Sequence, residues 1–310
     1  MRVLITGPTS FSGAFFIEEL SKAGHDVFTT LTKSQGEYTG IRGLRAAKAI
    51  EHAEVFEGVS FGDEEFLNIV QEQSFDVFCH HGAWTENYNS MDYNFQAAYD
   101  NNTKQMPAVC KALATNGCKS IVISASIFEG GINGSKPFSP HGLIKQITSQ
   151  TTEFYAHHAG LHFSRFVIPN PFGALDNPKL IDYLCREWYA GRTPQIRTPL
   201  YVRDNIHVEL MAKGFVYWLE KLPLEEETSI FAPAGMISTM GDFVDRVALE
   251  MRPRLGLDCN VILGPQTDFS QPMVLVNDTP LGHMFDDWNE DSAWEALAEH
   301  QKYLQVQRSS

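Results

Sequence analysis

The chain of 310 residues lacks the features that mark membrane, secreted and zinc-binding proteins. It has no apolar run of about 18 residues, the length that a membrane-spanning helix needs. Its first residues enter an apolar strand pattern without a cationic leader or a small-residue cleavage site, so export is not expected. No CxxC pair and no histidine at zinc-finger spacing accompany the five cysteines, which we expect to be reduced and mostly buried: Cys79, Cys110, Cys118, Cys185 and Cys259. We therefore predict a cytoplasmic protein with no membrane contact and no bound metal.

Positive charge is also scarce. The chain has 24 Lys and Arg against 38 Asp and Glu, a formal net charge of -14. Nucleic-acid binding relies on excess Lys and Arg to meet phosphates, so no nucleic-acid partner is expected. A local basic pocket for a small phosphorylated ligand is still compatible with this charge. The apolar fraction of 43% and charged fraction of 20% are typical of an ordinary globular protein and exclude a disordered or collagen-like chain.

Short apolar runs alternate with segments of helical period in the first half of the chain. The runs cover residues 3–6, 26–31, 75–79 and 120–124, and a helix is expected over residues 13–23. Continuous apolar strands are covered on both faces, so the pattern predicts an α/β fold with a parallel sheet between helices. From Pro169 onward, Pro, Gly and Trp are frequent, and helices are expected over residues 179–190, 240–249 and 291–303. This change predicts a domain boundary near residue 168.

The first twenty residues predict a strand, a tight loop and a helix. Gly7 permits a sharp turn, Gly13 permits close packing of helix on strand, and a helix N-terminus favours an anion such as a pyrophosphate. Ser10 stands where a further glycine would be expected, so an ordinary strand-to-helix turn is the alternative. We predict that a dinucleotide contacts five residues of this loop: Gly7, Thr9, Ser10, Phe11 and Gly13.

The end of the second predicted strand indicates which dinucleotide is preferred. An acidic residue there accepts hydrogen bonds from the ribose 2′-hydroxyl and favours NAD, but residues 30–33 contain no acid. Thr32 and Lys33 suit a 2′-phosphate, and Arg42 or Arg45 could add a second cation. We predict that NADP is preferred, with NAD as the alternative. A solvated loop with a lone lysine is the other interpretation.

Four segments resemble motifs of one family, the extended short-chain dehydrogenases/reductases, which include NAD(P)-dependent nucleotide-sugar epimerases, dehydratases and reductases. Residues 6–13 resemble TGxxGxxG, and Cys79-His80-His81-Gly82-Ala83 occupies the place of HxAA. Residues 120–126 resemble the strand that delivers a catalytic serine, and residues 201–208 are similar to RDxIHV. The resemblance extends over nearly the whole chain.

The family resemblance implies a domain organisation. Residues 1–168 are expected to form a Rossmann-type doubly wound parallel sheet that binds the dinucleotide. Residues 169–310 are expected to form a smaller, mainly substrate-binding C-terminal domain. The stretch near residues 201–222 is a candidate to return to the first domain.

The catalytic signature departs from the family pattern. The family's YxxxK appears here as His141 and Lys145, so the spacing is kept and the tyrosine is not. The resemblance implies catalytic roles for Asn102, Ser124 and Lys145, with His141 in place of the tyrosine and Lys145 also on the nicotinamide ribose. The Asp-Glu pair of the dehydratases is absent, since Ala125 follows Ser124, so dehydration is not expected.

His141 can replace a phenol chemically. Residues at i and i+4 share a helical face, so His141 and Lys145 would both point toward Ser124 at a strand end. An imidazole titrates near 6.5 and needs no large pKa shift to exchange protons. Lys145 and an oxidised nicotinamide would disfavour the imidazolium, which favours either a neutral His141 that accepts a proton or a transiently protonated His141 that donates it. A surface residue at a helix start is the alternative.

Further residues are assigned to the substrate. Ser126, Asn170 and Arg203 are predicted to bind it, with the Arg203 guanidinium on a diphosphate or, alternatively, in a structural ion pair near Asp204. His80 and His81 are interpreted as a strand-end pair satisfied by backbone rather than as metal ligands. Four aromatic residues could wall a sugar or base pocket or pack under a loop: Trp84, Tyr88, Tyr93 and Phe95.

Two functions remain open from the sequence. The first is an enzyme, expected as a homodimer, that transfers hydride between NAD(P) and the sugar, at C4, of a nucleoside-diphosphate sugar as a reductase or epimerase. The second is a non-catalytic NAD(P)-sensing protein that kept the fold and lost the tyrosine.

Overall fold

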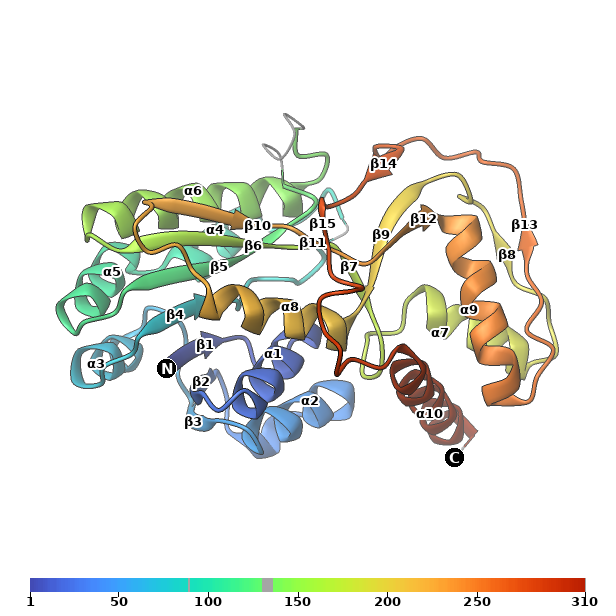
Figure 1. The fold of residues 1–310 in the computed structure, drawn as a ribbon, viewed down its shortest axis with the longest axis horizontal. Coiled ribbons are helices and arrows are strands. Elements are labelled where there is room, and N and C mark those ends of the chain that lie inside the picture. Colours follow the sequence, from blue (N-terminus) through green and yellow to red (C-terminus); the bar gives the residue numbers. More distant parts are fainter. Residues whose placement is uncertain (89, 130–135, 310) are drawn as a thin grey trace. The chain divides into compact units, whose positions relative to one another are not determined.

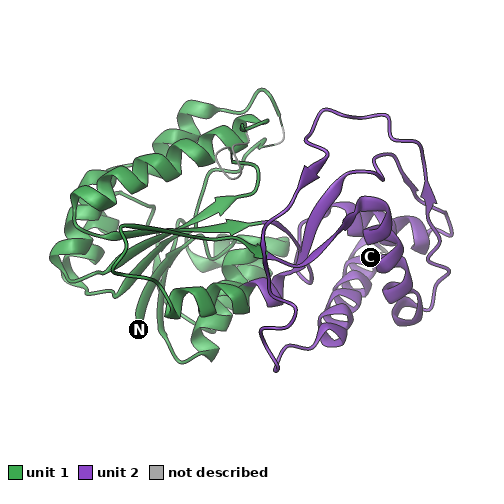
Figure 2. Cartoon of the chain, turned by 45° about the horizontal axis from the view of Figure 1, so that its top comes forward, with its two compact units in different colours: residues 1–168, 212–233 green, residues 169–211, 234–310 purple. Residues whose placement is uncertain are grey.

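The computed structural model describes residues 1–88, 90–129 and 136–309. The chain divides into two compact units, shown in green and purple in Figure 2. Unit 1 comprises residues 1–168 and 212–233, and unit 2 comprises residues 169–211 and 234–310.

Unit 1 is built on a seven-stranded parallel sheet with the order β10-β6-β5-β4-β1-β2-β3. The strands are β1 (Arg2–Thr6), β2 (Asp26–Leu31), β3 (Glu54–Glu57), β4 (Val77–His80), β5 (Ser120–Ser126), β6 (His162–Ile168) and β10 (Thr228–Phe231). This sheet confirms the predicted Rossmann-type fold. The strand order reverses between β1 and β4, and in such sheets a ligand crevice lies at the carboxyl ends of the strands at that point.

Helices cover both faces of this sheet (Figure 1). They are α1 (Phe11–Lys22), α2 (Gly40–Ile50), α3 (Glu64–Glu72), α4 (Phe95–Thr103), α5 (Met106–Thr115), α6 (Pro140–His158) and α8 (Val208–Glu220), with the short η1 (Gln35–Glu37) after β2. On one face Phe16 of α1 stacks on Phe215 of α8 at 4.2 Å, and Phe166 of β6 meets both rings edge-on. On the other face Phe78 of β4 packs with residues of α3 and α5.

The apolar runs form strands because both sides of the sheet are covered. Val3, Leu4 and Ile5 of β1 are fully buried. Each such side chain contributes roughly 1.5 to 3 kcal/mol by leaving water. The five cysteines are buried and unpaired, as predicted.

Unit 2 is organised around β9 (Val202–His207), which pairs with three short strands. These are β12 (Met236–Thr239), antiparallel, and β7 (Asn170–Phe172) and β14 (Val274–Leu275), both parallel to β9. Two-residue strands complete the unit: β8 (Gln195–Ile196), β11 (Pro233–Ala234), β13 (Ile262–Leu263) and β15 (Thr279–Pro280). The helices α7 (Leu180–Tyr189), α9 (Met240–Leu255) and α10 (Glu290–Ser309) bury a core that includes Trp188, Phe243 and Trp294.

Element boundaries differ from the predicted ones at helix ends. The predicted helix at 240–249 extends to Leu255 through Pro253 and ends at Gly256, whose φ of +66° suits glycine in a helix C-cap. Helix α1 begins at Phe11 rather than residue 13, because Ser10 caps it.

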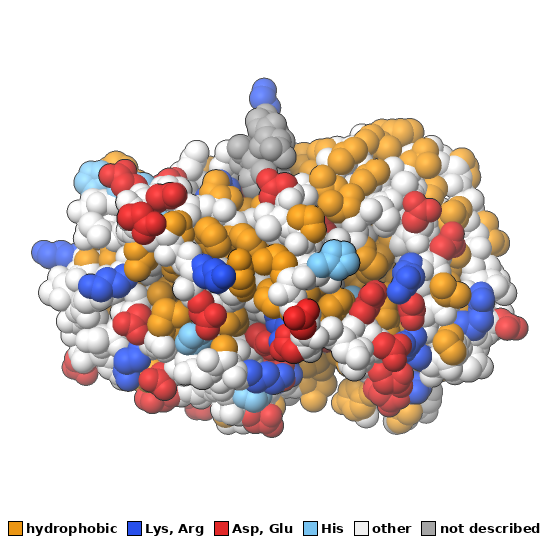
Figure 3. Space-filling view, viewed as in Figure 1, with side chains coloured by type: hydrophobic (Ala, Val, Ile, Leu, Met, Phe, Trp, Pro, Cys, Tyr) orange, Lys and Arg blue, Asp and Glu red, His pale blue; other side chains and the backbone are white. Residues whose placement is uncertain are grey.

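Acidic side chains are spread over the face that Figure 3 shows. Figure 3 shows acidic and basic side chains interspersed over one face of the molecule, with apolar side chains between them. Within the described part of the chain, no helix is long and apolar enough to cross a membrane.

Candidate active site

The loop between β1 and α1, residues 7–13, is called the glycine loop below. Gly7 has a φ of +78°, and a Cβ there would lie 2.8 Å from the Cα of Gly82. A Cβ on Gly13 would lie 2.3 Å from the carbonyl oxygen of Gly7. Both positions therefore require glycine, because the turn packs against itself and against the segment after β4.

Ser10 replaces the expected middle glycine as a helix cap. Its φ of -75° is accessible to any residue, and its Oγ accepts a hydrogen bond from the Gly13 N–H at 3.0 Å. The same hydroxyl donates to the Gly7 carbonyl at 2.8 Å. The first N–H groups of a helix have no intrahelical partner, so the start of α1 still favours an anion.

Basic side chains lie near this loop. An Arg42 Nη donates to the Thr9 hydroxyl at 3.2 Å, and its guanidinium lies 5.7 Å from the centre of the Tyr38 ring. The Tyr38 hydroxyl in turn contacts the Thr32 hydroxyl at 3.1 Å and accepts from the backbone N–H of Lys33 at 3.2 Å. The predicted residues Thr32 and Lys33 and the cation Arg42 are therefore linked through Tyr38.

Arg45 has a different role from Arg42. It is almost completely buried, with 2% exposed, and lies 5.5 Å from the centre of the Phe11 ring. Arg45 therefore packs beneath the glycine loop, and Arg42 is the arginine that contacts it.

Lys145 and Ser124 meet at the carboxyl end of β5, as the sequence predicted. Helix α6 begins at Pro140 and is capped by the Ser139 hydroxyl, which accepts from the Gly142 N–H at 3.1 Å. One turn into the helix, the buried Lys145 amine donates to the carbonyl oxygen of Ser124. Burial lowers the pKa of Lys145, and the nearby Glu129 carboxylate acts in the opposite direction.

His141 lies one helical turn before Lys145 and is half-buried. Its ring meets the edges of Tyr88 and Tyr93, with ring centres 5.4 and 6.2 Å away. Among the described residues, its buried Nδ1 has no hydrogen-bond partner. Burial and, to a smaller extent, Lys145 lower the pKa of His141 to about 4, so its ring is neutral at neutral pH.

The aromatic residues near His141 form a small core. Tyr93 is buried, and its hydroxyl donates to the Trp84 carbonyl at 2.9 Å. Burial raises the pKa of Tyr93 to about 12. Tyr88 and Phe95 pack in the same cluster, against Ile144 of α6. The Tyr93 phenol is thus committed to a structural hydrogen bond and does not replace the missing catalytic tyrosine.

His81 is a residue whose contacts sequence analysis missed. Its Nδ1 lies 2.5 Å from the Ser124 Oγ, and its Nε2 lies 2.8 Å from the Ser10 Oγ and 3.2 Å from the Ser12 Oγ. The prediction of a backbone-satisfied pair is therefore wrong for this ring. It holds for His80, whose Nε2 contacts the Asn102 carbonyl at 2.8 Å.

Asn102 joins three segments of unit 1. Its Oδ1 accepts from the Trp84 N–H at 2.9 Å, and its Nδ2 donates to the Thr148 hydroxyl of α6 at 3.4 Å. The side chain is buried, with 1% of the residue exposed. Through these contacts Asn102, which lies on α4, links the segment after β4 to α6.

Ser126 and Glu129 follow Ser124 in the chain. Ser126 ends β5 two residues after Ser124, on the same face, and is more exposed. Its N–H donates to Glu129 Oε1 at 2.7 Å, and its Oγ accepts from the Phe128 N–H at 3.2 Å. Glu129, which sequence analysis missed, is buried and also accepts from Ser149 at 3.1 Å and Arg165 at 2.7 Å.

Two predicted substrate residues, Arg203 and Asn170, belong to unit 2. Arg203 donates to the carbonyls of Val202, Pro272 and Met273 at 2.9 to 3.3 Å and to Gln271 Oε1 at 3.0 Å. Its guanidinium lies 4.4 Å from the centre of the Tyr201 ring.

The neighbouring polar residues of unit 2 have their own partners. Asp204 accepts from the N–H groups of Gly235 at 2.7 Å and Asn277 at 3.3 Å, whereas the hydrogen bonds of Arg203 in the described part of the chain go to carbonyl and amide oxygens. Asn170 is exposed and donates to Asn205 Oδ1 at 2.6 Å.

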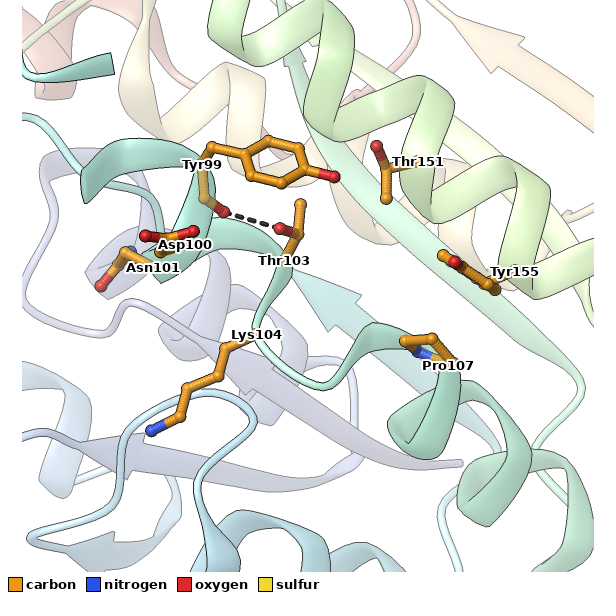
Figure 4. A pocket seen from close by; sticks show the side chains of 8 residues that line it. All are labelled: Tyr99, Asp100, Asn101, Thr103, Lys104, Pro107, Thr151 and Tyr155. Carbon is orange, nitrogen blue, oxygen red and sulfur yellow. Dashed lines mark hydrogen bonds between the residues drawn. The ribbon is translucent and has the colours of Figure 1, made fainter. Parts of the chain in front are cut away.

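A cavity of about 590 Å³ in unit 1 contains none of the predicted site residues. It is lined by Tyr99, Asp100, Asn101, Thr103, Lys104, Pro107, Thr151 and Tyr155 (Figure 4). Within the described ranges, no group of three or more His, Cys, Asp or Glu side chains is arranged to hold a metal ion.

The parallel sheet, the glycine loop at its switch point, and the Ser124–Lys145 contact are the arrangement of an extended short-chain dehydrogenase/reductase. Residues 3–231 match the NAD dependent epimerase/dehydratase family, and the chain belongs to this family.

Curated relatives and solved structures agree with this assignment. The UDP-glucose 4-epimerase of Neisseria meningitidis serogroup B is 28% identical over 252 residues, which are 69% of this chain and 72% of that protein. The UDP-glucose 4-epimerase of Drosophila melanogaster is 25% identical over 74% of this chain and 75% of its own length.

Two solved structures share the fold. The UDP-glucose-4-epimerase of Stenotrophomonas maltophila with bound NAD and formylated UDP-arabinopyranose has a TM-score of 0.75, at 20% identity and full coverage of both chains. The UDP-glucuronic acid 4-epimerase of Bacillus cereus, in complex with UDP-glucuronic acid and NAD, has a TM-score of 0.76 at 14% identity, covering 98% of this chain and 100% of that one.

The neutral His141 predicts a pH-dependent stability. Its pKa of about 4 lies below the ordinary 6.5, so between these values the unfolded chain binds a proton that the folded chain does not. The free energy of unfolding should fall as the pH decreases from 7 to 5, with about 1 to 2 kcal/mol of the loss due to this group. Urea unfolding at both pH values should show a loss smaller by that amount for His141→Phe.

Other titratable groups also change the free energy of unfolding with pH, but they are present both in the unmodified protein and in His141→Phe. Burial lowers the pKa of His81 to about 3, which adds to the loss at low pH. Burial raises the pKa of Asp204 to about 6, which acts in the opposite direction. An identical pH dependence in the two proteins would contradict a buried, neutral His141.

Proposed function

We propose that this protein is an NAD(P)-dependent oxidoreductase or epimerase that acts on the sugar, at C4, of a nucleoside-diphosphate sugar. The observation that carries the proposal is the buried Lys145 amine on the Ser124 carbonyl, at the carboxyl end of β5, two residues before the half-buried Ser126 hydroxyl. The UDP-glucose 4-epimerases among its relatives support this substrate class. We also propose that it acts as a homodimer, which the mass measured by light scattering tests.

The residues of the glycine loop suit a dinucleotide. The positive φ of Gly7 and the cap at Ser10 present the N–H groups at the start of α1, and Arg42 adds a cation at Thr9. Phe11 and Gly13 complete the loop, and Thr32 and Lys33 would meet the adenosine ribose or its 2′-phosphate. Lys145 would meet the nicotinamide ribose. When bound, the nicotinamide supplies the hydride acceptor or donor.

His141 supplies the acid-base function in this proposal. Its neutral ring accepts the proton of the sugar hydroxyl as the C–H bond breaks, and returns it in the reverse step. Lys145 disfavours the imidazolium, so the proton is readily given back. Ser126 donates a hydrogen bond to the same sugar oxygen, Ser124 lies beside it at the strand end, and Asn102 holds α6 against α4.

The second candidate is a non-catalytic NAD(P) sensor. The observation that favours it is the aromatic packing of His141, whose Nδ1 has no partner among the described residues. Such a protein would bind the dinucleotide without turning over a sugar.

The first prediction of this proposal concerns the choice of dinucleotide. Lys33→Asp should weaken NADPH binding about tenfold or more, because a charged contact to the 2′-phosphate is replaced by repulsion. NADH binding should change little or improve. Fluorescence titration of both dinucleotides measures the preference, and Lys111→Asp on the exposed surface of α5 is the matched charge control. Tighter NADH than NADPH binding by the unmodified protein contradicts the prediction.

The second prediction concerns the diphosphate. We propose that Arg203 contacts it, so Arg203→Ala should raise the dissociation constant of uridine diphosphate about tenfold or more. Calorimetry measures the affinity, and Arg197→Ala removes an exposed charge from the same unit as a control. Because Arg203 also binds backbone carbonyls, urea unfolding must accompany the titration. An unchanged affinity in the folded variant shows that Arg203 serves no ligand.

The third prediction concerns His141. His141→Phe should reduce turnover roughly 10² to 10⁴-fold if general acid-base help is lost. His141→Tyr should keep or increase activity, since it restores the phenol that Lys145 is spaced to activate. In the unmodified protein, sugar oxidation should be flat near neutral pH and fall as the pH decreases through about 4, where the ring is protonated. Single-turnover nicotinamide absorbance measures these rates.

The same assay separates the two candidate functions. Equal rates for His141→Phe and the unmodified protein would remove the catalytic assignment. A sensor predicts no hydride transfer by any of the three proteins and equal dinucleotide affinity in all of them.

A further inference from the structure

The His81 imidazole is bound to hydroxyl groups on both of its nitrogens. Nδ1 contacts Ser124 of β5 at 2.5 Å, and Nε2 contacts Ser10 and Ser12 of the glycine loop at 2.8 and 3.2 Å. The ring therefore lies between the segment proposed to hold the dinucleotide phosphates and the strand end that receives Lys145. No role in catalysis or binding follows for His81 from the family signature.

The ring is held in place from several sides. Phe16 meets it edge-on at 5.2 Å between ring centres. A Cβ on Gly13 would lie 3.0 Å from its Cδ2, and one on Gly7 would lie 3.3 Å away. The backbone N–H of His81 donates to the Thr6 hydroxyl at 3.1 Å. Glycine at both loop positions thus leaves the space that this imidazole fills.

The hydrogen bonds indicate which nitrogen carries the proton. A neutral imidazole has one N–H donor and one bare nitrogen acceptor. Two hydroxyls converge on Nε2, and the closer one, Ser10, already donates its proton to the Gly7 carbonyl. The 2.8 Å contact between Ser10 and Nε2 therefore needs the proton of the ring, so Nε2–H donates to the Ser10 oxygen. Nδ1 is accordingly the acceptor, and the Ser124 hydroxyl donates to it.

We propose that His81 is a positioning residue that connects the glycine loop to Ser124. Its Nδ1 accepts the Ser124 proton and so fixes the position of the Ser124 hydroxyl at the strand end. Its Nε2–H anchors the loop through Ser10. The catalytic part of this inference rests on the proposed function, whereas the connection itself does not.

Two substitutions separate the two ends of the connection. His81→Asn places an amide where Nδ1 lies and keeps an acceptor for the Ser124 proton, but no longer reaches the loop. His81→Gln extends an amide toward the position of Nε2 and keeps the loop contact. We expect His81→Asn to weaken dinucleotide binding about 3- to 10-fold with little effect on the single-turnover rate at saturation. We expect His81→Gln to lower that rate about 3- to 10-fold with little effect on affinity.

A double substitution tests whether the rate effect passes through Ser124. In a Ser124→Ala background, His81→Gln should cause no further loss of rate, because its target hydroxyl is already absent. Additive losses, or equal effects of the Asn and Gln variants on both quantities, would overturn the proposal. A purely structural role of His81 predicts such equal effects.

A spectroscopic measurement on the unmodified protein is independent of the variants and of turnover. Nitrogen-15 NMR of histidine-labelled protein should show a neutral His81 with its proton on Nε2 down to about pH 4, assigned by its loss in His81→Asn. A proton on Nδ1, or a charged ring at neutral pH, would overturn the inference. If the unmodified protein transfers no hydride, the proposed function fails, while the NMR spectrum and the dinucleotide affinities still decide the role of His81.

Discussion

The buried amine of Lys145 is the group on which the electrostatics of this site depend. It donates to the Ser124 carbonyl at the end of β5. Burial lowers its pKa, and the nearby Glu129 carboxylate opposes this shift. Glu129 is itself held by Arg165, Ser149 and a backbone N–H, so its charge is fixed in place. A cation in this position favours neutral histidines around it.

The three histidines near Lys145 all have a lowered pKa, for which burial is the larger cause and the Lys145 charge a smaller one. Burial and Lys145 lower the pKa of His80 and of His141 to about 4, and of His81 to about 3. For His80 and His81, neutrality gives the ring one donor and one acceptor, which suits contacts on both sides. For His141, the proposed proton acceptor, it means a ring that is already deprotonated at neutral pH but is a weaker base than an ordinary imidazole. A phenol in its place has an ordinary pKa near 10. The charge of Lys145 would favour the phenolate and lower this pKa toward neutrality, which suits proton exchange.

The sequence predicts the parts of this site that depend on local spacing. Strand, glycine turn and helix around Gly7 are encoded within a dozen residues, and the i, i+4 spacing of His141 and Lys145 follows from helix geometry. The contact of Lys145 with Ser124 follows from placing a strand end beside that helix. Ser10 as a helix cap is also a local feature, although it was expected as a departure from the motif.

The remaining contacts depend on pairing between distant segments. His81 meets Ser124 because β4 lies beside β5 in a register that pairs His80 with Ile123, and nothing in the sequence near His81 specifies that register. Arg203 binds carbonyls of residues 272–273, some 70 positions later in the chain. Glu129 belongs to a turn after β5 whose partner Arg165 lies on β6. Such side-chain neighbours are set by tertiary packing, which composition and periodicity do not specify.

Hydride transfer to a sugar is the central claim, and isotope transfer tests it most directly. The protein would be incubated with NADPH fully deuterated at the nicotinamide C4 position and with a uridine-diphosphate 4-keto sugar. The account predicts a sugar nucleotide heavier by one deuterium, with the label at sugar C4. Recovery of the unreduced ketone together with intact NADPH would contradict it.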